Sequence, residues 1–149
     1  MLLVVDANVL FSFFKKDSII RELIIDPESK HDLELISPTK LLSELDKHKS
    51  EICNKAKISL GEYEFPRNVL EVYIKIFPDK FWQNSKSKAE EMLSKHIKDT
   101  PYVALCLSFK NNGYKVSLWS NEEKLKILER FGIKVFSTSE LLKELDLSK

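Results

Sequence analysis

The chain opens with an uninterrupted apolar run, Leu2 to Val5, that stops at Asp6. A short run of Leu and Val without polar alternation is typical of a parallel strand that helices bury on both faces. Open α/β sheets keep their ligand sites outside the C-terminal ends of such strands. The opening segment therefore predicts an α/β fold with Asp6 at the functional edge of its sheet.

Strand and helix patterns alternate along the rest of the chain. Further strands are predicted at residues 33–36, 74–77, 115–119 and 133–136, and several helices between residues 53 and 98. The alternation predicts one domain over residues 1–149, a three-layer α/β/α sandwich with a mainly parallel central sheet.

Helix starts are predicted from capping signals. The capping positions are Asp17 or Ser18, Ser37 before Pro38, Asp99 or Thr100 before Pro101, and the pairs Ser120 with Glu123 and Ser137 with Glu140.

Length and composition fit a folded protein. The 149 residues are 43% hydrophobic and 32% charged, enough for one domain with a real core. The formal net charge of +1 argues against coating nucleic acid through bulk charge. Cys53 and Cys106 form no metal or redox motif, and no segment has the pattern of a signal peptide or a membrane span. We expect a cytoplasmic protein with reduced thiols and no membrane partner.

Four acids have settings that bring them to the same edge of the sheet: Asp6, Glu44, Asp99 and Glu122. A cluster of uncompensated carboxylates persists mainly where a divalent cation neutralises it. The pattern therefore favours a metal-dependent hydrolase. Asn8 adds an oxygen donor two residues after Asp6.

Each acid also has a structural interpretation. Asp6 and Asp99 are possible helix caps, although Asn8 and Thr100 are alternative caps at the same helix starts. Glu44 is a possible exposed partner of His48, four residues on in its helix. Glu122 is a possible helix-dipole partner, with Glu123 completing the capping box.

The chain resembles the PIN domain family of Mg/Mn-dependent ribonucleases. The resemblance lies in VVDANVL at residues 4–10, SELDK at 43–47, KDTPYVAL at 98–105 and LWSNE at 118–122, and it spans nearly the whole chain. The additional helices of the central block favour the stand-alone single-domain members found in archaea and bacteria.

The resemblance implies a catalytic quartet of Asp6, Glu44, Asp99 and Glu122. Asp6, Asp99 and Glu122 would bind Mg²⁺ or Mn²⁺, and Asn8 and Ser120 would support them. It implies hydrolysis of phosphodiester bonds in single-stranded RNA, a homodimer, and an antitoxin or another protein partner. The family usually has Asp where this chain has Glu122, and the longer side chain is expected to displace its carboxylate outward.

Residues 80–88 mix lysines with aromatic residues, and Lys86 and Lys88 are candidate RNA contacts. The alternative is that Phe81 and Trp82 pack into the core and the lysines form a solvated face.

Two other functions stay open at this point. One is a PIN-like module that binds RNA or protein around the acidic pocket and cleaves nothing. The other is a phosphoryl-transfer or receiver-like domain in which Asp6 is phosphorylated.

Overall fold

The computed structural model describes residues 1–26, 32–94 and 97–147, and the structural statements below concern this part of the chain. Its strands form one parallel sheet in the order β3-β2-β1-β4-β5. The strands are β1 (Leu2–Val5), β2 (Glu34–Pro38), β3 (Ile74–Phe77), β4 (Val116–Trp119) and β5 (Val135–Phe136). The predicted parallel sheet is confirmed, with small differences at the strand ends.

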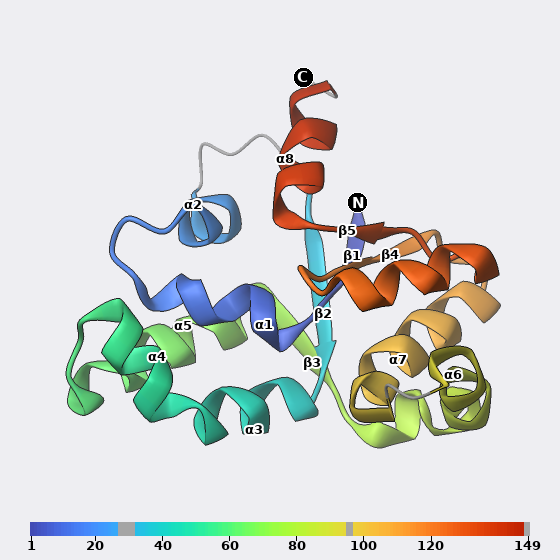
Figure 1. Cartoon of the computed structure of the whole chain (residues 1–149), viewed down its shortest axis with the longest axis horizontal. Coiled ribbons are helices and arrows are strands. Elements are labelled where there is room, and N and C mark those ends of the chain that lie inside the picture. Colours follow the sequence, from blue (N-terminus) through green and yellow to red (C-terminus); the bar gives the residue numbers. More distant parts are fainter. Residues whose placement is uncertain (27–31, 95–96, 148–149) are drawn as a thin grey trace.

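Helices cover both faces of the sheet (Figure 1). The α-helices are α1 (Ala7–Leu10), α2 (Ile19–Ile25), α3 (Lys40–Lys47), α4 (Lys49–Ala56), α5 (Glu64–Tyr73), α6 (Lys86–Leu93), α7 (Thr100–Asn111) and α8 (Thr138–Leu147). The 3-10 helices are η1 (Phe11–Phe14), η2 (Leu60–Glu62), η3 (Asp79–Phe81), η4 (Gln83–Ser85), η5 (Ile97–Asp99) and η6 (Glu123–Phe131). None of the helices in the described ranges is long and apolar enough to cross a membrane.

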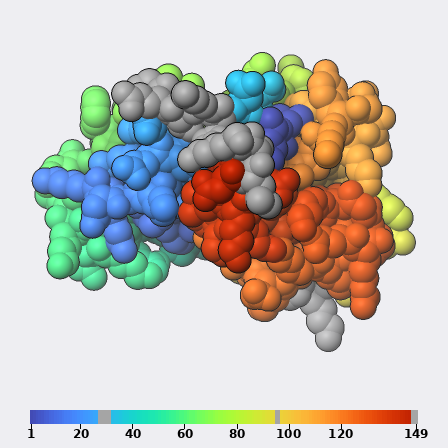
Figure 2. Space-filling model, turned by 90° about the horizontal axis from the view of Figure 1, so that it is seen from above, coloured from blue at the N-terminus to red at the C-terminus, as the bar shows by residue number. Residues whose placement is uncertain are grey.

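The two outer layers come from different parts of the chain. Helices α1 to α5 gather on one side of the sheet, and α6 and α7 lie on the other (Figure 1). Seen from above, the first part of the chain occupies one half of the molecule, and its last third fills much of the other half (Figure 2). These layers and the sheet form the predicted three-layer sandwich.

Helix α7 is the central helix of its layer. It packs against β1, β2 and β4 on one side and against α6 on the other. Six consecutive residues, Tyr102 to Leu107, are therefore buried. An apolar pattern around the whole helix is typical of a helix with neighbours on all sides. This packing fixes the N-terminus of α7 against the sheet.

The predicted N-cap at Ser37 is wrong. Ser37 belongs to β2, and its buried hydroxyl donates a hydrogen bond to the carbonyl oxygen of Val5 at 2.9 Å. Pro38 still pairs with Phe77 of β3, because an extended residue before proline suits a strand as well as a helix start. The predicted single helix from Pro38 to about Ser50 is two helices, α3 and α4, that meet at His48.

Other predicted helix signals are confirmed. The Ser18 hydroxyl accepts from the backbone N–H of Arg21 at the start of α2. Ser137 and Glu140 form a capping box before α8, because each side chain accepts from the other residue's backbone N–H.

Candidate metal centre

Asp6 directly follows the central strand β1. Its backbone N–H donates to the carbonyl oxygen of Trp119 at 3.0 Å, so the β1–β4 pairing continues one residue past the strand. Strand β1 is also where the chain order of the sheet reverses, between β2 on one side and β4 on the other. Ligand sites of open α/β sheets lie at such switch points. The prediction that Asp6 lies at the C-terminal edge of the sheet is confirmed.

Asp99 lies at the junction of η5 and α7. Its side chain makes no capping hydrogen bond, and the hydroxyl of Thr100 is buried without a hydrogen-bond partner among the described residues. Both predicted side-chain caps are therefore wrong. Pro101 in the first turn reduces the number of backbone N–H groups that need a partner. The Asp99 carboxylate is left free to face the sheet edge.

Ser120 connects Glu122 to Asp6. The Ser120 hydroxyl donates to Asp6 Oδ2 at 2.7 Å and accepts from the backbone N–H of Glu122 at 3.1 Å. The predicted capping box with Glu123 is wrong, because the serine hydroxyl is used between these two acids and the following segment is 3-10 rather than α-helical. The predicted supporting position of Ser120 agrees with this contact.

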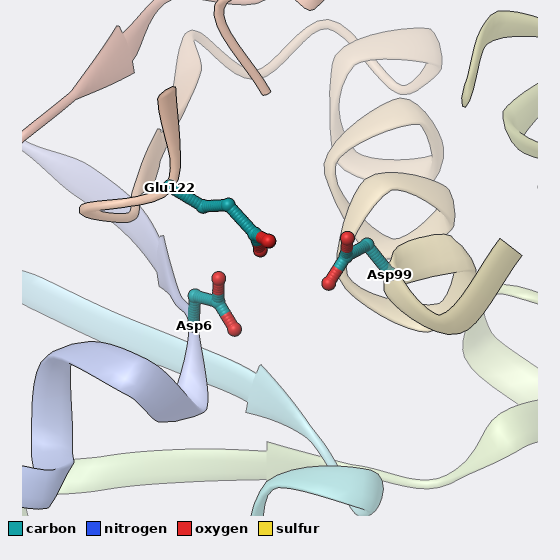
Figure 3. Close-up of side chains that lie close together, drawn as sticks. All are labelled: Asp6, Asp99 and Glu122. Carbon is teal, nitrogen blue, oxygen red and sulfur yellow. The ribbon is translucent and has the colours of Figure 1, made fainter. Parts of the chain in front are cut away.

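The three carboxylates of Asp6, Asp99 and Glu122 point toward one another (Figure 3). One oxygen from each lies within 4.8 Å of the other two. Asp6 is 4% exposed and Asp99 6% exposed, and Glu122 is partly buried. The longer side chain of Glu122 therefore reaches the cluster, and the expected outward displacement does not remove it from the group.

The cluster is electrostatically strained without a cation. Burial, and then the negative charges of Asp99, Glu44 and Glu122, raise the pKa of Asp6 to about 7, although the hydrogen bond from Ser120 opposes this shift. Burial and the charges of Glu122 and Glu44 raise the pKa of Asp99 to about 6, opposed by Lys98 and Lys40. A divalent cation would remove both causes of the strain, because it replaces solvent and neutralises the carboxylates.

Glu44 stands beside this group rather than in it. Its charge raises the pKa values of Asp6 and Asp99, but its oxygens are not among those within 4.8 Å of one another. Its ion-pair partner is Lys40, at 3.4 Å, four residues earlier in the chain. The alternative pairing with His48 is wrong, because His48 pairs with Glu51 at 3.3 Å.

Sequence reasoning missed two lysines beside the acids. Lys98 Nζ lies 3.9 Å from Glu122 Oε1, and Lys40 Nζ donates a hydrogen bond to the carbonyl oxygen of Lys98. Both positions were visible in the sequence, since Lys98 directly precedes Asp99 and Lys40 is at i−4 from Glu44. The cluster is therefore acidic at its centre and basic at one side.

Two further polar side chains lie in the segments that build the centre. The Tyr102 hydroxyl and Asn8 Oδ1 are buried without a hydrogen-bond partner in the described part of the chain. Burial and the charges of Glu44 and Asp6 raise the pKa of Tyr102, so its hydroxyl keeps its proton. Tyr102 was not predicted, because within the apolar sequence of α7 it looks like a core residue.

The predicted RNA contacts lie on helix α6. Lys86 and Lys88 are exposed and lie 4.0 Å from Glu90 and Glu91 of the same helix. Trp82 is buried, in agreement with the core interpretation, but Phe81 is 49% exposed, which contradicts it.

The donor set fits a hard cation. It consists of carboxylate oxygens, which are the preferred ligands of Mg²⁺ and Mn²⁺, and includes no thiolate or imidazole. The buried, mutually repelling acids are a second sign of fit, because their burial is costly unless a cation compensates them. The fold and the centre together define an α/β protein with an acidic cluster, suited to a divalent cation, at the C-terminal edge of its sheet.

Comparison with known families agrees with this description. Residues 4–146 match the model of a family described as PIN domain. The chain therefore belongs to the PIN domain family, whose members are generally metal-dependent nucleases. No curated protein matches the sequence significantly.

Proposed function

We propose that the protein is a metal-dependent endoribonuclease that hydrolyses phosphodiester bonds of single-stranded RNA. The observation that carries the proposal is the convergence of Asp6, Asp99 and Glu122 within 4.8 Å at the C-terminal edge of a parallel sheet. Family membership supports the nuclease class, and the carboxylate donors support Mg²⁺ or Mn²⁺ as the cofactor. RNA rather than DNA as the substrate rests on the resemblance alone.

The metal is held by Asp6, Asp99 and Glu122 in this proposal. When bound, it supplies charge neutralisation at the phosphate and a water of lowered pKa. Ser120 orients the Asp6 carboxylate through its 2.7 Å hydrogen bond. Asn8 has an unpaired amide oxygen in the helix that follows Asp6, and we assign it a supporting role.

Glu44 acts from outside the group of three ligands. Its carboxylate is close enough to influence the pKa values of Asp6, Asp99 and Tyr102. We assign it the fourth catalytic position, where it orients water at the metal or accepts a proton from it. The Tyr102 hydroxyl, which keeps its proton, is a donor available to hold the Glu44 carboxylate.

The test is cleavage of a mixed-sequence single-stranded RNA with Mn²⁺, with Mg²⁺ and with EDTA. Asp6→Asn and Asp99→Asn should abolish cleavage, because each removes one ligand charge from the centre. Asp17→Asn is the matched control, since Asp17 is an exposed aspartate outside the cluster. Cleavage that persists in EDTA, or in both cluster variants, would refute the proposal.

Absence of cleavage by a folded wild type that binds Mn²⁺ would favour the alternative, a PIN-like module that binds without cutting. Two features of the sequence favour this alternative: the glutamate at position 122, where the family usually has aspartate, and the near-neutral net charge of +1. The first argument is weakened by the structure, because a Glu122 oxygen lies within 4.8 Å of Asp6 and Asp99 oxygens.

The surface of α5 supports a protein partner. Phe65 and Val72 are each 79% exposed and Tyr73 is 43% exposed, which is a large apolar area for one short helix. We propose that a second copy of the chain or an antitoxin covers it, in a cytoplasmic toxin-like or RNA-processing system. The homodimer is tested by analytical ultracentrifugation of the wild type and of the Phe65→Ser variant, each without a partner protein. If α5 forms the dimer interface, the wild type should sediment as a dimer and the variant as a monomer.

A further inference from the structure

Lys98 extends from the segment that carries a metal ligand. It belongs to η5, directly before Asp99, and its side chain is 73% exposed. Its ammonium nitrogen lies 3.9 Å from Glu122 Oε1. An exposed cation, paired with one of the three acids, therefore lies beside the cluster.

The backbone of Lys98 is held in place by Lys40. The Lys40 ammonium donates to the Lys98 carbonyl oxygen, and it also lies 3.4 Å from Glu44 Oε1. Lys40 thus links helix α3, which carries Glu44, to η5, which carries Asp99. The tether fixes the main chain at Lys98 and leaves the exposed side chain able to change partner.

The ion pair with Glu122 is easily exchanged. The two charges are 3.9 Å apart and the Lys98 side chain is 73% exposed, so water can replace the carboxylate as the partner of the ammonium at little cost. A divalent cation bound by Glu122 competes for the same carboxylate with a higher charge. The lysine then keeps its position at the centre but loses its anionic partner.

We propose that Lys98 is a phosphate-binding residue of this centre. Once the metal has bound Glu122, the Lys98 ammonium donates a hydrogen bond to a non-bridging oxygen of the scissile phosphodiester. The inference rests on the proposed nuclease function and adds to it the residue that holds the substrate phosphate. An ammonium suits this role as a compact charge with three donors on a flexible stem. It also explains how a chain of net charge +1 holds a polyanion next to acids, through a local rather than a bulk charge.

Three variants test the role of Lys98. Lys98→Met removes the charge and keeps much of the stem, and Lys98→Arg restores the charge. Lys134→Met is the matched control, since Lys134 is 54% exposed and lies 3.3 Å from a glutamate, Glu129. It directly precedes β5, the outer strand of the sheet, and β4 separates β5 from β1 and Asp6.

RNA binding is measured with Ca²⁺ in place of Mn²⁺ over a range of salt concentrations, and cleavage is measured with Mn²⁺. Lys98→Met should lower kcat/KM by about 10- to 100-fold, as expected for the loss of a charge-assisted hydrogen bond. The slope of log affinity against log salt should fall by about 0.7, the value for one phosphate contact on a single strand. Lys98→Arg should recover most of both losses, and Lys134→Met should match the wild type.

Affinity for Mn²⁺, followed by the metal-dependent shift in Tm, separates this role from a structural one. Lys98→Met should bind Mn²⁺ at least as tightly as the wild type, because a competing cation has been removed from Glu122. A clear loss of Mn²⁺ binding would overturn the inference, and so would unchanged cleavage and an unchanged salt slope. If the wild type binds RNA without cleaving it, only the proposed nuclease function is refuted, and the salt dependence of RNA binding still tests the role of Lys98. If the wild type binds no RNA, the inference about Lys98 is refuted.

Discussion

Replacement of Asp6 by asparagine should stabilise the metal-free protein at neutral pH. The folded protein raises the pKa of Asp6 from 3.8 to about 7, because the buried carboxylate is poorly solvated and lies near other acids. The folded state therefore binds this proton more tightly than the unfolded state. The contribution of the Asp6 carboxyl to the free energy of unfolding is fully present below about pH 4 and is lost as the pH rises toward about 7.

The magnitude follows from the shift. A difference of about 3 pKa units corresponds to about 4 kcal/mol of lost stability once the carboxyl is ionised. An asparagine has the same shape, and its amide oxygen still accepts from Ser120. The variant should therefore gain about 4 kcal/mol at pH 8, or roughly 8 to 16 °C in Tm for a chain of this length. At pH 4 the gain should fall below about 1 kcal/mol.

The assay is urea and thermal unfolding of both proteins in EDTA between pH 4 and pH 8, with Asp17→Asn as the control for loss of an exposed charge. Saturating Mn²⁺ should reverse the order of stability at pH 8, because only the wild type has all three ligands. The electrostatic reasoning would be refuted by a variant that is no more stable than the wild type at pH 8, or by a gain that does not depend on pH.

Three other perturbations have clear expected outcomes. Mn²⁺ affinity measured by titration calorimetry should rise between pH 5 and pH 8, because the metal must displace protons from Asp6 and Asp99, whose pKa values are about 7 and about 6; a flat profile would contradict these shifts. Ser120→Ala should weaken Mn²⁺ binding by about 10-fold, through loss of the donor that orients Asp6, with little change in the circular dichroism spectrum; undiminished affinity would show that this hydrogen bond is dispensable. Glu122→Asp should also weaken Mn²⁺ binding, because the carboxylate is withdrawn by about 1.5 Å from a cluster that the longer side chain reaches; tighter binding would indicate that the family's usual aspartate fits here as well.

The sheet was predictable because its signals are local and strong. The apolar runs before Asp6 and up to Trp119 each describe a segment buried on both faces, which is what β1 and β4 are at the centre of the sheet. Ser37 shows the limit of such reasoning. A serine before proline is a good helix start, but pairing of β2 with its two neighbours outweighs that local preference.

The candidate centre was predictable as a set of acids but not in its geometry. The sequence indicates that Asp6, Asp99 and Glu122 follow strands or begin helices, and the topology then brings them together. It contains no sign that Glu44 stands apart, because that depends on the direction of α3 from the sheet. Ser120 was expected to serve both as a supporting group and as a cap, and one hydroxyl between Asp6 and Glu122 leaves no hydrogen bond for the second role.

The wide separation of the three ligands along the chain has a consequence for biosynthesis. Asp6 is made early, whereas Glu122 follows a strand that pairs with β1 across more than a hundred residues. A nascent chain that ends before β4 contains two of the three acids and lacks the strand that positions the third. On the proposed function, the cation can be bound only after nearly all of the domain has left the ribosome, so an incomplete chain would have no assembled centre with which to cleave the mRNA that encodes it.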